Sequence, residues 1–185
     1  GVVFRELLER ELPELSWREL FRTLRLMELA GEVVAGRFFE GVPGLQFATH
    51  EAVRRLAAGL PEDRIWWLNA VDPASPCGLG LELWRDLLPK RLPGNHLVLH
   101  GRRLVVVSER RGGVLRILVE PDHPRLPDYL RFLEVLVTRS VHPENHLIVE
   151  RVNGGPASSS PFRPTLAARF HVTRAGAALR LDRAY

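Results

Sequence analysis

The sequence is poor in two residue types, cysteine and lysine. Cys77 is the only cysteine, so the chain cannot form an internal disulfide, and a zinc site built from several cysteines is excluded. This composition fits a reducing compartment. Lys90 is the only lysine, and Leu88 and Pro89 precede it where a phosphate-binding loop has glycines. A P-loop ATPase is therefore excluded, and the chain is expected to hold no cofactor of its own.

Long apolar runs and metal-binding histidine pairs are also missing. The longest runs, Leu104–Val107 and Leu115–Val119, are far shorter than the roughly 20 residues that cross a bilayer. No charged and then apolar leader opens the chain, so we expect a soluble, cytoplasmic protein with no membrane partner. His96 and His100 are four residues apart, but they fall on an expected strand and turn. We therefore expect no metal site.

The charge balance is mildly basic, with 26 basic and 22 acidic residues, and every basic residue except Lys90 is arginine. Arginine suits phosphates and base edges, although a GC-rich genome or a hot habitat also favours it. Composition alone therefore does not decide whether the chain binds nucleic acid. The 185 residues, 45% of them hydrophobic, can bury one large core or two small ones. The chain opens without methionine on an apolar-periodic stretch, which indicates a segment of something longer.

Two helices are predicted at the start of the chain. Phe4, Leu7, Leu8 and Leu12 recur at helical spacing until Pro13 ends the pattern. Ser16 and Glu19 form a possible capping box for a second helix that stops at Gly31. One face of this second helix is apolar. The other face carries Arg18, Arg22 and Arg25.

After Gly31 the hydrophobic period changes to two. Glu32–Val34 and Arg37–Phe39, separated by Ala35 and Gly36, predict a tight hairpin, and Gln46–Ala48 predicts a third, short edge element. Thr49 is expected to cap a further helix that runs out at residues 59–61. Two helices followed by a hairpin are the tail of a winged helix, whose first helix we expect upstream of this chain.

In winged helices the second helix enters the major groove of DNA and the hairpin touches the backbone beside it. Arg18, Arg22, Arg25 and Arg37 are therefore our candidate DNA-contacting residues. The alternative is that the helical arginines form an ordinary solvated face.

The rest of the chain is predicted to be rich in β-strands. Ile65–Ala70 is a strand-like run. His96–Leu99, Leu104–Val107 and a strand that ends at Val119 are expected to form a three-stranded meander, and a helix starts at Pro127. Strands are also expected at residues 146–152, 170–172 and 178–181. We predict an α+β fold, with a truncated winged-helix segment over residues 1–62 and a β-meander or barrel-like domain with a packed helix over residues 63–185.

Asp72 is the candidate catalytic carboxylate. It follows a strand that carries Trp66 and Trp67 and precedes Pro73, so it can be held partly desolvated beside aromatic surface. The alternative is that the Asp-Pro pair simply starts a turn in which the carboxylate accepts backbone N–H bonds. The two tryptophans are likewise either core residues or platforms on which bases stack.

These residues together resemble one family, the C-terminal region of Lhr, the large helicase-related proteins of bacteria and archaea. The resemblance covers nearly the whole chain. It is carried by residues 1–7, 17–20, 31–32, 36–38, 46–48, 51–53, 69–73, 152–154 and 160–161. Asn69–Pro73 is similar to the family's Ser-Ala-Ala-Asp-Pro, whereas Ser75 stands where the family usually has asparagine and Pro76-Cys77 replaces Leu-Val.

The resemblance implies that the chain serves a superfamily 2 ATP-dependent DNA helicase linked to DNA repair, whose motor binds ATP and magnesium outside this chain. Single-stranded DNA, forked duplexes and RNA–DNA hybrids are the implied nucleic-acid partners, and the upstream helicase core is the implied protein partner. The leading interpretation is a nucleic-acid-binding accessory module. One alternative is a uracil-type DNA glycosylase that uses Asp72, with Asn69 and the tryptophans Trp66 and Trp67 holding a flipped base. A second alternative is an oligomerisation module that forms homo-oligomers.

Overall fold

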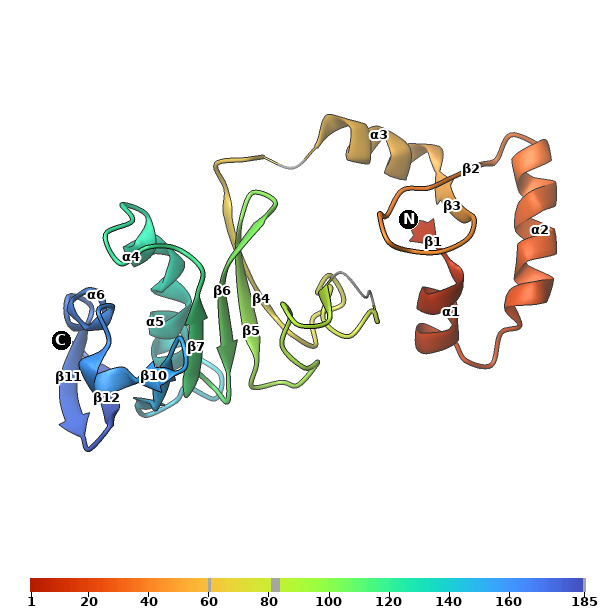
Figure 1. Ribbon diagram of the computed structural model, residues 1–185. Helices are drawn as coiled ribbons and strands as arrows, with labels where there is room; N and C mark the ends of the chain where they lie inside the picture. The colour runs from red at the N-terminus through yellow and green to blue at the C-terminus, as the bar shows by residue number, and fades with distance from the viewer. Residues whose placement is uncertain (60, 81–83, 185) are drawn as a thin grey trace. The chain divides into compact units, whose positions relative to one another are not determined.

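The computed structural model describes residues 1–59, 61–80 and 84–184. The chain divides into two units (Figure 1): the first comprises Gly1–Pro61 and Gly78–Leu87, and the second comprises Glu62–Cys77 and Leu88–Tyr185. The predicted division into domains of residues 1–62 and 63–185 stays a prediction. None of the described helices is both long enough and apolar enough to cross a membrane.

The first unit is a small winged-helix arrangement around a three-stranded antiparallel sheet with the strand order β1-β3-β2. Its core holds Phe47, Leu24 and Val33, and the ring of Phe21 meets the ring of Phe47 edge-on at 5.5 Å. The elements are β1 (Val2–Val3), α1 (Arg5–Glu11), α2 (Trp17–Leu29), β2 (Val33–Gly36), β3 (Gln46–Thr49) and α3 (His50–Ala58).

The boundaries of the predicted helices are largely confirmed. Gly31 lies just beyond α2 in the left-handed conformation, with φ of +77°, which glycine adopts without strain. The Thr49 hydroxyl caps α3 by accepting a hydrogen bond from the Ala52 N–H at 3.2 Å. The predicted capping box at Ser16 is wrong in its detail, because the Ser16 side chain makes no capping hydrogen bond.

The predicted tight hairpin is wrong. Gly36 and Ala35 belong to strand β2, and its partner is β3, with Val33 opposite Thr49 and Gly36 opposite Gln46. A two-residue hairpin turn needs positive φ at one or both central residues, and neither Ala35 nor Gly36 has it. Residues 37–45 therefore form a long wing loop, and Gln46–Ala48 lies in the central strand of the sheet instead of at an edge.

The second unit contains a six-stranded sheet in the order β10-β9-β7-β6-β5-β4 and a three-stranded sheet in the order β11-β12-β8. The strands of the larger sheet are β4 (Ile65–Asn69), β5 (His96–His100), β6 (Arg103–Glu109), β7 (Val114–Ile117), β9 (Arg151–Val152) and β10 (Gly155–Pro156). Strands β5 to β7 form the predicted antiparallel meander, and β4 pairs with β5 in antiparallel orientation beside it. Strands β7 and β9 pair in parallel. Strand β7 ends at Ile117, two residues before the predicted end.

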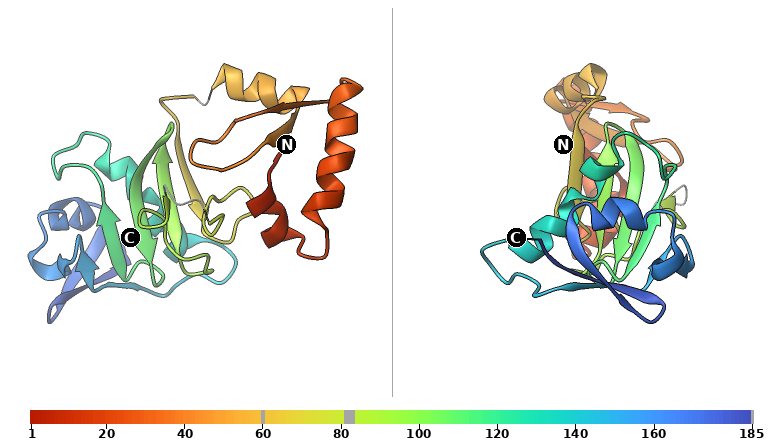
Figure 2. Two further views of the ribbon diagram at one scale, coloured as in Figure 1. Left: turned by 45° about the vertical axis from the view of Figure 1, so that its right-hand side comes forward. Right: turned by 90° about the vertical axis from the view of Figure 1, so that its left-hand side faces the viewer.

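Helix α5 and the smaller sheet close the core of the second unit. The predicted helix from Pro127 is two short helices, α4 (Leu126–Tyr129) and α5 (Arg131–Thr138). Leu133 and Leu136 on α5 are buried in one cluster with Leu115 of β7 and Leu181 of β12. Figure 2 gives two more ribbon views of these helices and strands. The remaining elements are β8 (Leu147–Val149), the 3-10 turn η2 (Ala157–Ser159), α6 (Arg163–Ala167), β11 (Phe170–Ala175) and β12 (Ala178–Arg183).

The predicted α+β fold is confirmed. The barrel-like alternative for the second part is not, because the sheets of the described residues do not close on themselves. β4 is one edge of the six-stranded sheet and β10 is the other.

Candidate nucleic-acid interface

The predicted arginines of α2 lie together on its exposed face. Leu24 and Phe21 point from the opposite side of the helix into the core of the first unit. Residues 18, 22 and 25 are three or four positions apart, a spacing that keeps them on one side of a helix. All three arginines are exposed. The sequence pattern and the packing of α2 therefore agree on which side of the helix is basic.

The three arginines differ in their partners. Arg25 is paired with Glu28 on the next turn of the helix. Within the described part of the chain, Arg18 and Arg22 have no acidic side chain within ion-pairing distance. The positive charge of these two guanidinium groups is therefore not neutralised by a neighbouring carboxylate and is available to a phosphate.

Arg37 opens the wing loop and is exposed. The loop behind it is held by the buried side chain of Gln46, a residue that sequence reasoning did not single out. Gln46 Oε1 accepts hydrogen bonds from the N–H groups of Phe38 and Phe39 at 2.8 and 2.9 Å. Its Nε2 donates to the carbonyls of Phe39 and Val42 at 3.1 and 3.4 Å. One amide side chain from the central strand thus shapes the wing that carries Arg37.

Asp72 lies in a turn. Its Oδ1 accepts a hydrogen bond from the Ala74 N–H at 2.8 Å, and its carbonyl accepts one from the Ser75 N–H at 2.9 Å. This is the turn geometry that the Asp-Pro pair favours. Asp72 is also not among the residues that line the cleft beside Asn69. Among the described residues, the cleft that holds Asn69 therefore does not include Asp72.

Trp66 and Trp67 are both more than a third exposed, at 38% and 42%, so neither is a core residue. They are adjacent on edge strand β4 and therefore point to opposite faces of the sheet. Trp67 lines a cleft of about 570 Å³ with Arg125 and Arg131 from the helical side. Trp66 lies on the other face, where the guanidinium of Arg64 is 5.9 Å from its ring centroid. The two rings do not form one stacking platform.

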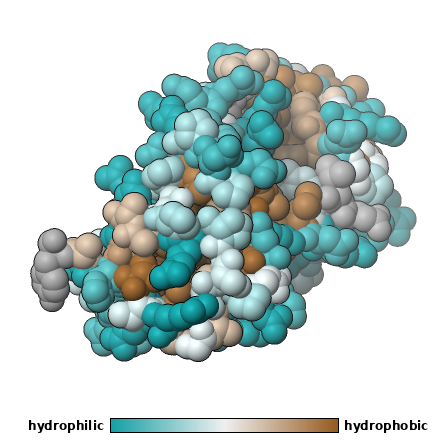
Figure 3. Space-filling view, turned by 60° about the vertical axis from the view of Figure 1, so that its left-hand side comes forward, coloured by the Kyte–Doolittle hydropathy of each residue, from teal (hydrophilic) through white to brown (hydrophobic). Residues whose placement is uncertain are grey.

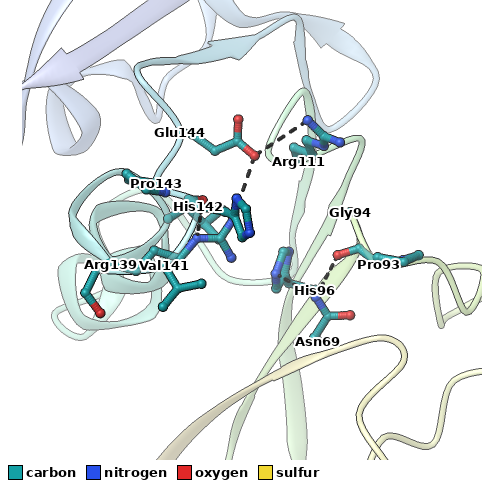
Figure 4. A pocket seen from close by; sticks show the side chains of 12 residues that line it. Asn69, Pro93, Gly94, His96, Arg111, Arg139, Val141, His142, Pro143 and Glu144 are labelled. Atoms are coloured by element: carbon teal, nitrogen blue, oxygen red, sulfur yellow. Dashed lines mark hydrogen bonds and ion pairs between the residues drawn. The ribbon is translucent and has the colours of Figure 1, made fainter.

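Asn69 and His96 lie in a second cleft, of about 820 Å³ (Figure 4). The orientation of the Asn69 amide is fixed because Oδ1 accepts from the Val71 N–H at 3.1 Å and Nδ2 donates to the Pro93 carbonyl at 2.6 Å. Nδ2 is also 3.3 Å from Nε2 of His96. That ring nitrogen therefore accepts, and the ring proton is on Nδ1.

His96 is only 3% exposed, and its ring is neutral near pH 7. Burial, together with the positive charge of Arg139, lowers the pKa of His96 to about 4. Arg139 and Arg111 share Glu144 as an acidic neighbour, since their guanidinium nitrogens lie 3.9 and 3.7 Å from its Oε1. Two positive charges at this cleft thus face one negative charge.

The described residues contain no group of three or more side chains placed to hold a metal ion. Figure 3 shows one face of the chain, on which hydrophilic side chains dominate and apolar side chains form only small patches. Scattered apolar groups of this kind are common on protein surfaces.

The helix pair, the three-stranded sheet and the wing loop define a winged-helix protein. Residues 1–67 match the family model for the winged-helix domain of large helicase-related protein. The chain is 27% identical over 172 residues to the Lhr helicase/uracil glycosylase of Escherichia coli K12, an alignment that covers 88% of this chain. It is 34% identical over 146 residues, or 73% of this chain, to the Lhr helicase/probable uracil glycosylase of Mycolicibacterium smegmatis.

The chain belongs to the family of large helicase-related (Lhr) proteins, and the predicted resemblance to their C-terminal region is confirmed. The alignments cover only 11% and 9% of the two relatives, so the chain spans about a tenth of their length.

Proposed function

We propose that this chain is a DNA-binding accessory module of an Lhr-type helicase, and that its first unit holds duplex DNA. The observation that carries the proposal is the exposed face of α2, on which Arg18 and Arg22 lack acidic partners within the described residues. A winged helix places this helix in the major groove and its wing on the neighbouring backbone, so Arg37 would contact phosphate there. The helicase core, with its ATP and magnesium, would be the partner outside this chain.

The test is the salt dependence of duplex binding, measured by fluorescence anisotropy on the 185-residue chain. Each phosphate contact contributes a slope of about −0.9 in a plot of log K against log salt for B-form DNA. Arg22→Ala and Arg37→Ala should therefore weaken binding to every duplex sequence and flatten the slope by about one each. Arg55→Ala is the matched control, because Arg55 is an exposed helical arginine paired with Glu51. Unchanged affinity and slope in both test variants would refute this role.

A second candidate function, uracil-DNA glycosylase linked to DNA repair, is favoured by the names of both relatives. Asp72 would stabilise the positive charge that develops on the sugar as the glycosidic bond breaks, after the base has been flipped out. Against this role, the Asp72 carboxylate is engaged with the Ala74 N–H.

The variant Asp72→Asn distinguishes a catalytic carboxylate from one that only holds the turn. Asparagine keeps an oxygen that can accept from the Ala74 N–H but carries no charge. The chain is incubated with uracil-containing single-stranded DNA, and abasic sites are then cleaved with alkali. Cleavage by the wild type that is lost in Asp72→Asn supports a catalytic carboxylate. Equal cleavage by both proteins removes Asp72 from that role while leaving the glycosylase function itself open to other residues.

Self-assembly is a third candidate, because Leu26 and Leu29 on α2 are 68% and 79% exposed. Sedimentation of the chain as a monomer at high concentration would exclude it.

A further inference from the structure

Helix α5 and edge strand β4 border two neighbouring clefts in the second unit. Trp67, Arg131 and Val135 line the first, and Asn69, His96 and Arg139 line the second. The rings of Trp67 and His96 connect the clefts, with their centroids 6.1 Å apart. We call the surface formed by Trp67, His96, Arg111, Arg131 and Arg139 the α5 seam.

The seam places an exposed aromatic ring between positive charges. Trp67 and Asn69 lie on the same face of β4, two residues or about 7 Å apart along the strand. Arg131 is the first residue of α5 and Arg139 is its C-cap, so the helix separates their backbones by about 12 Å. Arg111 reaches the second cleft from the turn between β6 and β7. A single nucleic-acid strand, in which bases alternate with phosphates, would match this order of groups.

The charges of the seam favour a modest electrostatic attraction of phosphate groups. The four arginines of the two clefts face three carboxylates, those of Asp63, Asp128 and Glu144. Arg125 is paired with Asp128 at 3.4 Å, whereas Arg131 has no acidic side chain within 4 Å among the described residues. His96 adds no charge near pH 7, because its pKa is lowered, and little ring surface, because it is only 3% exposed, so Trp67 is the ring available for stacking. Affinity would therefore depend on stacking as well as on a few phosphate contacts.

We propose that the α5 seam binds single-stranded DNA, with one base stacked on Trp67, a neighbouring nucleotide in the cleft at His96, and phosphates held by Arg131 and Arg139. A duplex cannot use the ring of Trp67 in this way, because the faces of its bases are already stacked on one another. The inference extends the proposed DNA-binding function to a second form of DNA. It uses none of the residues assigned to the duplex, so each of the two proposals can fail without the other.

The test is the binding of a fluorescently labelled oligothymidylate of about ten nucleotides to the 185-residue chain. Loss of one base–aromatic stack costs a factor of about 5 to 150 in affinity, so Trp67→Ala should weaken binding by an amount in this range. Trp66→Ala, on the opposite face of the same strand, should bind as the wild type does. Trp67→Phe should retain part of the affinity, which guards against a folding defect in the alanine variant.

The salt dependence of binding in arginine variants is the second measurement. Each phosphate contact to a single strand contributes a slope of about −0.7 in log K against log salt, so Arg131→Ala should flatten the slope by about that amount. Arg102→Ala is the control, because Arg102 is exposed and paired with Glu62 at 3.2 Å. Arg22→Ala should weaken duplex binding and leave oligothymidylate binding unchanged. Wild-type affinity in Trp67→Ala, or equal losses in Trp66→Ala and Trp67→Ala, would overturn the proposal.

Discussion

The side chain of Gln46 should control both the stability of the first unit and the shape of its DNA-contacting wing. Replacing Gln46 by leucine keeps a similar volume but removes all four hydrogen bonds to the backbone of residues 38, 39 and 42. A neutral hydrogen bond contributes about 0.5–1.5 kcal/mol net, and a buried backbone group left unpaired costs about 1–3 kcal/mol. The wing is partly exposed, so water would satisfy some of these groups.

We therefore expect Gln46→Leu to lower the free energy of unfolding by about 2–4 kcal/mol, a large part of the 5–15 kcal/mol of a typical domain. Urea denaturation measures the loss, and amide hydrogen exchange of Phe38 and Phe39 shows whether the wing has been released. Duplex affinity should fall about as far as in Arg37→Ala, because Arg37 is then held less firmly. Oligothymidylate binding should not change.

Gln46→Glu supplies the sharper comparison, since a glutamate can accept from both N–H groups but cannot donate to the carbonyls of Phe39 and Val42. It also buries a charge and should be destabilised as well. Unfolding of Gln46→Leu within about 0.5 kcal/mol of the wild type, with unchanged protection of both amides, would show that the wing does not depend on this side chain.

Two further predictions concern the second unit. The pKa of His96 is lowered to about 4, so the unfolded chain takes up this proton first as the pH falls, and stability is lost below pH 6.5. About 2 kcal/mol should disappear between pH 7 and pH 5, and His96→Gln should not show this component in pH-dependent denaturation; identical pH profiles would contradict it. The Asn153 side chain donates to the Ile117 carbonyl at 2.9 Å and accepts from the Ile117 N–H at 2.7 Å. Asn153→Ala should therefore lower the free energy of unfolding by about 1–3 kcal/mol. Urea denaturation measures the loss, and Asn145→Ala, at an exposed position, is the control.

Local patterns predicted most of the helices and the meander. The apolar face of α2, the stop at Gly31 and the cap at Thr49 depend on residues within one or two helical turns, and all three are confirmed. The partner of β2 depends on a strand ten residues further along the chain, and nothing within residues 32–39 specifies it. The pattern therefore suggested the nearest apolar segment, 37–39, as the partner.

The candidate site shows the same division between local and long-range information. The exposed side of α2 follows from helical spacing, and the turn at Asp72 follows from the Asp-Pro pair. The role of Gln46 could have been suspected from a polar residue directly before Phe47 and Ala48. The seam could not, because Trp67, Arg111 and Arg131 come from three separate parts of the sequence and only the packing of α5 on the sheet brings them together.

The division of the chain has a consequence for how such a module can be inherited or transplanted. Residues 78–87 belong to the first unit although they follow sixteen residues of the second, Glu62–Cys77. The polypeptide therefore passes between the units three times, after positions 61, 77 and 87. A genetic exchange with a single breakpoint would leave one unit without a piece of itself. Recombination and protein engineering are thus expected to transfer the two units together.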